Sequence, residues 1–163
     1  METANWIIAI STTTYALVVI FTIFYIAKQL RESKLLREAS VLKEVYDYVI
    51  RTHNCRKIIY HHKDTIMKVK SQKDLENLEI NYHEITDAIH EVANCYHYIG
   101  FLINYGLLSN KSAIFEEGGD TILHVYDIIK PVIEQDRKRM STEKYKQYLE
   151  YLVKEINAYK KCK

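Results

Sequence analysis

The sequence predicts an all-α protein in which a single N-terminal transmembrane helix continues into a cytoplasmic helical bundle of about five helices. The chain has 163 residues with only four glycines and one proline, and residues 1–99 contain neither. Residues that interrupt helices are therefore rare. Apolar residues recur at steps of three and four along most of the chain, as on one face of a helix. The small numbers of glycine, proline and cysteine residues (four, one and three) also exclude collagen-like, linker-rich and disulfide-scaffold proteins.

The membrane span is predicted at Trp6–Ala27, a 22-residue run without a charge. A helix of that length covers roughly 33 Å, enough for a hydrocarbon core of about 30 Å. Trp6 and Tyr25 suit the two interfaces. A buried core helix is one alternative, and a cleaved signal peptide is another. The signal peptide would need a basic start and a small-residue cleavage site, and only Glu2 carries a charge before the run. We therefore expect an anchor over 1–27 and a domain over 28–163.

The flanking charges predict the orientation of this anchor. Residues 1–5 contain no Lys or Arg, whereas four follow the run: Lys28, Arg31, Lys34 and Arg37. The positive-inside rule then places the N-terminus outside the inner membrane and the domain in the cytoplasm. Three cysteines without a framework read as reduced thiols, which fits that side: Cys55, Cys95 and Cys162.

The first helix is expected to leave the membrane without a break and to end at the turn-forming residues Thr52–Asn54. A second helix should cover about 54–70. Ser71 and Asp74 then form a capping box, because the acid stands three residues after the serine. The third helix begins there.

This third helix has the clearest pattern in the chain, a stripe of apolar residues at alternating steps of three and four that we call the 75–103 stripe. Its members are Leu75, Leu78, Tyr82, Ile85, Ile89, Val92, Tyr96, Ile99 and Ile103. We expect it to be the centre of the bundle or, alternatively, an exposed interface for a protein partner or a second copy. Gly100 within the helix indicates close approach of a neighbouring helix, and Gly106 suits the left-handed position that ends one.

Three further helical segments are expected. A short helix begins at Ser109 and stops at Gly118–Gly119. The next is capped by Asp120, and Pro131 kinks it because proline removes a backbone donor. The last helix starts at Ser141 or Thr142.

Charge is distributed in two blocks. Residues 51–73 hold seven Lys or Arg and one Asp, and residues 74–91 hold six acidic residues and no Lys or Arg. Two antiparallel helices would place these opposite charges side by side. Alternatively, the basic block contacts anionic lipids of the bilayer through Arg56, Lys57, Lys63 and Lys68. A net charge of +2 is too small to argue for nucleic acid.

The candidate chemistry is sparse. Three histidines recur every seven residues: His83, His90 and His97. Neighbours in this series lie roughly 10 Å apart along a helix, which is too far for them to bind one zinc ion. Asp87 and His90 form one Asp-x-x-His pair, whereas a di-iron bundle needs two Glu-x-x-His pairs. We expect no metal and no cofactor, and we expect the histidines to line an exposed edge of the third helix.

Arg56 and His61 match the Arg-x4-His spacing of HEPN-type ribonucleases, which are also small helical proteins. In those enzymes the His acts in acid–base chemistry and the Arg on the phosphate charge, from paired subunits. The polar residue usual after the Arg is Lys57 here. The resemblance implies an alternative function, a membrane-tethered ribonuclease or an abortive-infection effector of phage defence. A surface charge pattern explains the same residues.

The segment from Val92 to Leu108, VANCYHYIGFLINYGLL, together with Val125–Ile133, which contains Tyr126 and Pro131, resembles a prokaryotic domain family of unknown function. In that family a membrane segment precedes a small helical domain, and a helix of this pattern ends in Gly-Leu-Leu or Gly-Leu-Ile. The resemblance implies an anchored helical domain and supplies no activity. The sequence thus favours an interaction or accessory protein over an enzyme, with the stripe and its glycines as the structural or interaction residues: Tyr82, Ile85, Ile89, Val92, Tyr96, Ile99, Gly100 and Gly106.

Overall fold

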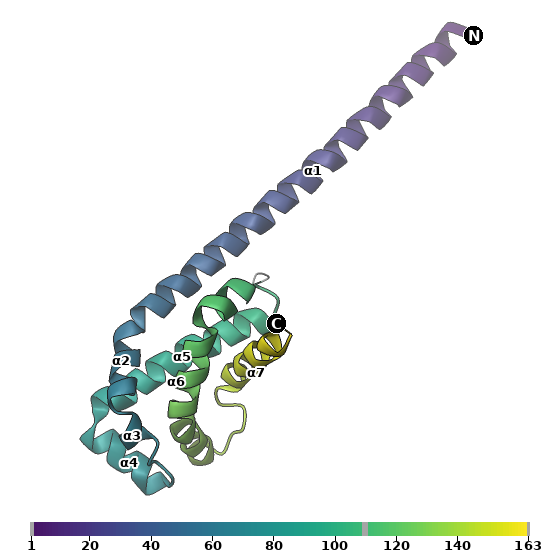
Figure 1. Cartoon of the computed structure of the whole chain (residues 1–163). Helices are drawn as coiled ribbons and strands as arrows, with labels where there is room; N and C mark the ends of the chain where they lie inside the picture. The colour runs from purple at the N-terminus through teal and green to yellow at the C-terminus, as the bar shows by residue number, and fades with distance from the viewer. Residues whose placement is uncertain (1, 109–110, 163) are drawn as a thin grey trace. The chain divides into compact units, whose positions relative to one another are not determined.

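The structure is a computed structural model that describes residues 2–108 and 111–162, without the side chains of residues 2–13 and 16. Within these residues every regular element is a helix, which confirms the all-α class (Figure 1). The helices are α1 (Glu2–Arg51), α2 (His53–His61), α3 (Lys63–Ile66), α4 (Gln72–Asn81), α5 (His83–Asn104), α6 (Lys111–Met140) and α7 (Gln147–Lys161). The chain divides into two compact units, 1–40 and 41–163.

The unit 1–40 consists of helix α1 alone, unbroken as the sequence predicts. The part of the expected span that carries described side chains is exposed and apolar, including Leu17, Phe21 and Phe24. Among the described residues, no helix carries an apolar stretch long enough to cross a bilayer. The side chains of residues 6–13 and 16 of the expected span, including that of Trp6, lie outside the described part of the structure.

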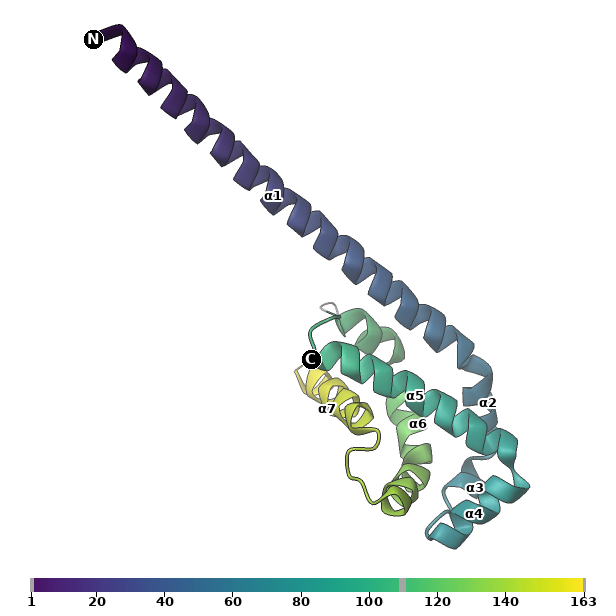
Figure 2. The same ribbon diagram turned by 180° about the vertical axis from the view of Figure 1, so that it is seen from behind.

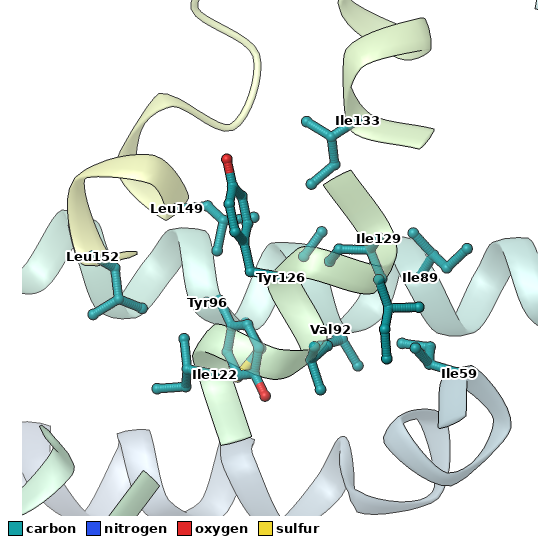
Figure 3. Close-up of a cluster of buried hydrophobic side chains, with 14 of the residues drawn as sticks. Ile59, Ile89, Val92, Tyr96, Ile122, Tyr126, Ile129, Ile133, Leu149 and Leu152 are labelled. Carbon is teal, nitrogen blue, oxygen red and sulfur yellow. The ribbon is translucent and has the colours of Figure 1, made fainter. Parts of the chain in front are cut away.

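The unit 41–163 is built around α5, which contacts α2, α4, α6 and α7 (Figures 1 and 2). Twelve of its residues are buried. Figure 3 shows Ile89, Val92 and Tyr96 of α5 lying among side chains of α2, α6 and α7, such as Ile59, Ile129 and Leu149. Eight of the nine residues of the 75–103 stripe are buried in this core, and Tyr82 is 48% exposed. The stripe therefore lies inside the body.

Tyr82 also corrects the expectation of one continuous third helix. It has φ −142° and ψ 54°, so it ends α4 and precedes α5. Its carbonyl oxygen accepts the first bonds of the new helix, from the amides of Ile85 and Thr86. Helix α4 begins with the capping box of Ser71 and Asp74, as predicted. The stripe keeps its period across the break, which is why the pattern hides it.

Two glycines take the positions that the sequence indicates. A Cβ on Gly100 would lie 1.9 Å from the carbonyl oxygen of Tyr148, so α7 approaches α5 as closely as a glycine permits. Gly106 has φ +65°. Its amide donates to Ile103 and that of Leu107 donates to Leu102, at 3.1 and 2.9 Å, which completes a Schellman motif at the end of α5.

Gly118–Gly119 does not stop a helix, contrary to expectation. Helix α6 runs through both glycines and through Pro131. Gly119 is buried, and a Cβ there would lie 3.1 Å from Ile156 of α7, so its smallness serves packing between helices. Because α6 is continuous, Asp120 is not its cap, and Ser109, the expected start, lies outside the described residues.

Two other expected boundaries are wrong. The segment 54–70 contains two helices, α2 and α3, which meet at His62. The last helix begins at Gln147, after a loop in which Ser141 and Lys146 have φ of +50° and +56°. A Ser-Thr pair marks a helix start only where the chain after it can continue as a helix, and the left-handed Lys146 prevents this.

Gly100→Ala should destabilise the protein by about 1–3 kcal/mol, because the new methyl group must push the backbone of α7 away. Gly118→Ala is the matched control. Its Cβ would meet only Ile122, at 3.9 Å, and alanine is favoured over glycine within a helix by about 1 kcal/mol. Thermal unfolding of the two variants checks this. Equal stability of Gly100→Ala and wild type would contradict the close approach.

Ile89→Ala should cost about 2–5 kcal/mol, because it leaves a cavity in the core. Ile89 is 1% exposed. Ile80→Ala on the neighbouring α4 should change the free energy of unfolding by less than about 0.5 kcal/mol, since Ile80 is 69% exposed. If Ile89→Ala left the stability unchanged and instead separated a dimer in sedimentation, the stripe would be an interface.

Candidate functional site

A partly open pocket of about 220 Å³ lies within the unit 41–163, between the end of α1, α2, α5 and α6. We call it the Arg56 pocket. Helical spacing places its residues: positions 45 and 49 share one face of α1, and positions 114, 118, 121 and 122 share one face of α6. The lining residues are Val45, Tyr46, Val49, Arg56, Tyr96, Ile114, Glu117, Gly118, Thr121 and Ile122.

Arg56 joins α2 to the end of α1. Its Nη1 donates to the carbonyl oxygen of Val49 and to Oγ1 of Thr52, both at 3.0 Å. The Thr52 hydroxyl donates to the same Val49 oxygen, at 3.0 Å. The last carbonyls of a helix have no partner within it, so these bonds stabilise the corner between the two helices. This structural role of Arg56 was missed by sequence reasoning, because a spacing of seven residues across a turn has no recognisable signature.

Tyr96 supplies the buried polar group of the pocket. It is 1% exposed, and its hydroxyl has no hydrogen-bond partner in the described structure. In Figure 3 this hydroxyl points the opposite way to that of Tyr126. Burial raises the pKa of Tyr96, and the nearby charge of Arg56 opposes the shift. The hydroxyl therefore keeps its proton at neutral pH and can donate a hydrogen bond.

Glu117 and Thr121 form the exposed rim of the pocket. Tyr46 Oη donates to Oε2 of Glu117 at 3.1 Å. Arg56 and Glu117 line one pocket with opposite charges, and within the described chain no ion pair joins them. The arrangement offers a cationic donor, a neutral donor and a carboxylate around an apolar space.

The structure does not bring Arg56 and His61 together. His61 is exposed and lines a different surface pocket with Lys57, His62 and Glu84. Its ring packs edge-on against that of His62, with centroids 4.8 Å apart. Arg56 and His61 thus line different pockets, and the ribonuclease interpretation stays a prediction about paired chains.

The three histidines of α5 have different surroundings, which corrects the expectation of an exposed edge. His83 is exposed. His90 is half-buried, and its Nδ1 lies 3.4 Å from the hydroxyl of Tyr145. His97 is half-buried against Tyr148, with ring centroids 5.2 Å apart. Helix α7 and the loop before it cover this edge. Among the described residues, no group of three His, Cys, Asp or Glu could hold a metal ion.

The two charge blocks do not form ion pairs with each other in the described residues. Glu79 of the acidic block pairs with Arg139 at the end of α6, at 2.7 Å. The second nitrogen of Arg139 donates to Asp136 at 2.6 Å. Of the basic residues expected to contact lipid, Lys57 and Lys68 are exposed, whereas Lys63 and Arg56 are half-buried.

The contacts of Arg139 with Glu79 and Asp136 reveal a polar cluster that sequence reasoning missed. Asp136 is 1% exposed, and one of its oxygens has no partner in the described structure. Burial raises its pKa, while the charges of His90 and Arg139 oppose the shift. The cluster joins α4, α5 and α6, whose charged residues are up to 60 positions apart, so no local pattern could have indicated it.

Comparison of the chain with family models shows the family to which it belongs. The model of the family described as "Domain of unknown function (DUF4760)" matches residues 7–156. The chain belongs to this family. The expected resemblance to a domain family of unknown function is thus confirmed, and DUF4760 carries no activity with it. Comparison with curated proteins found no match, and comparison with solved structures found none.

The His97→Gln variant of this DUF4760 protein should lose less stability than the wild type when the pH falls. Burial lowers the pKa of His97, and the charge of Lys146 adds to this. A folded pKa below the unfolded value of about 6.5 means that the unfolded chain binds more protons, so stability falls as pH drops through about 6.5. Unfolding at pH 7.5 and 5.5 measures this. His83→Gln, at an exposed site, should keep the wild-type dependence, and an identical dependence for His97→Gln would contradict the assignment.

Proposed function

We propose that the protein is a single-pass inner-membrane protein whose helical domain, on the cytoplasmic side, acts as a binding or accessory module. One observation carries the proposal. Large apolar side chains are exposed from Tyr15 to Ile26 along α1, among them Phe21 and Phe24. A stable helix in water normally exposes only one polar face, and an apolar face needs a cover. The charge-free sequence of 6–27 makes a bilayer the cover that fits.

The charges after this segment support the orientation. Lys28, Arg31, Lys34 and Arg37 are all exposed. Lys28 and Lys34 lie 3.9 Å from Glu32 and Glu38, one turn along the helix. Acidic residues contribute little to the positive-inside bias, so these pairs leave the bias in place.

The body supports binding rather than catalysis. Its half-open Arg56 pocket is mostly apolar, with a few polar groups, which is the usual composition of a ligand site. The candidate dyad of Arg56 and His61 is divided between two pockets. A binding role requires no change in the positions of these residues.

A double variant tests the anchor. Ile20→Asp with Phe24→Asp places two charges within the span, where a charge costs about 2.5–3.5 kcal/mol at the centre of a membrane helix and less towards its ends. We expect it to leave the membrane fraction, whereas wild type should stay there through a high-pH wash. Leu35→Asp with Leu36→Asp is the control, since both leucines are exposed on the same helix beyond the span. Wild type in the soluble fraction would refute the anchor.

Reporter fusions at the C-terminus test the orientation. A reporter that works only in the cytoplasm should be active there, because the basic residues follow the span. One that works only outside the cytoplasm should be silent. The reverse pattern would place the helical domain on the other side of the membrane.

A further inference from the structure

We propose that the Arg56 pocket binds a small monocarboxylate with an apolar body, such as a short fatty acid. The pocket lies wholly within 41–163, so this inference does not depend on membrane anchoring. Three features carry it: the apolar walls, the unpaired hydroxyl of Tyr96, and the charge of Arg56.

The walls select an apolar body of limited size. Val45, Ile114 and Ile122 are buried and line the space together with Val49. A volume of about 220 Å³ is below the roughly 300–1,000 Å³ of sites for drug-sized ligands. A helix of a second chain could not enter such a space, whereas a chain of a few methylene groups could.

Tyr96 requires an acceptor. Nearly every buried hydroxyl in a folded protein has a partner, because an unpaired one has lost its bond to water without replacing it. The Tyr96 hydroxyl is the exception within the described core of this pocket. A ligand oxygen that reaches this hydroxyl would accept a hydrogen bond from it and remove the deficit.

Arg56 makes that acceptor an anion. Arg56 and Tyr96 line the same pocket, and the charge of Arg56 opposes the rise in the pKa of Tyr96. Nη1 of Arg56 bonds to Val49 and Thr52, and the guanidinium also acts on the Tyr96 hydroxyl. Its remaining N–H groups suit the two oxygens of a planar carboxylate.

Glu117 limits the charge of the anion. It holds its place on the rim through the Tyr46 hydroxyl, and its carboxylate repels a second negative charge at short range. A phosphate monoester carries up to two negative charges at neutral pH, so a singly charged carboxylate fits better.

Calorimetry on the purified full chain in lipid nanodiscs tests the proposal, with empty nanodiscs as the blank. Hexanoate should bind with one molecule per chain. Hexylamine, with the opposite charge, should not bind, and hexyl phosphate should bind at least tenfold more weakly. Absence of hexanoate binding to folded wild type would overturn the proposal, and tighter binding of hexyl phosphate would overturn the carboxylate assignment.

Tyr96→Phe should weaken the binding of hexanoate at least fivefold. It should leave the unfolding temperature unchanged or raise it, because the substitution removes only the unpaired hydroxyl. Tyr126→Phe is the matched control: Tyr126 is buried in the same core, and its hydroxyl points away to Glu150, 3.5 Å distant. Gly118→Leu, which adds a side chain in the pocket, should abolish binding. Wild-type affinity in both Tyr96→Phe and Gly118→Leu would refute the site.

Discussion

The burial of α5 is the constraint on which the rest of the helical body depends. Helices α2, α4, α6 and α7 all contact it, and its residues from Ile85 to Ile103 supply a large share of the core. A helix that is covered on most of its circumference fixes its neighbours, because each must present a complementary apolar face. Gly100 and Gly119 then set how closely α7 can approach α5 and α6. The close packing of α7 therefore depends on two residues that have no side chain, Gly100 and Gly119.

This arrangement also produces the Arg56 pocket. Tyr96 belongs to the apolar stripe that faces the core, so its ring is buried, and it also lines the pocket together with residues of α1, α2 and α6. The corner at Thr52 turns the chain from α1 into α2, and Arg56 fastens that corner. The helices therefore leave a small apolar space with one cation beside it. The candidate site is a consequence of how the chain turns around α5.

The sequence predicts the features that local periodicity and backbone chemistry determine. The stripe, the capping box at Ser71 and the left-handed Gly106 are of this kind. It fails where tertiary contacts decide the outcome. Gly118–Gly119 resembles a helix stop, yet Gly119 packs against Ile156 within a continuous helix. The Asp136 cluster and the role of Arg56 depend on residues brought together by the fold. The sequence singles out Arg56 as well, but as part of a dyad with His61, which lines a different pocket.

Residue-level hydrogen exchange on the full chain tests the central role of α5 most directly. If the body is organised around α5, the amides of residues 87–103 should exchange only through global unfolding and should be the slowest in 41–163. The amides of α4, which contacts fewer elements, should exchange faster through local opening. Exchange of α5 as fast as that of α4, with the slowest amides in another helix, would contradict the account.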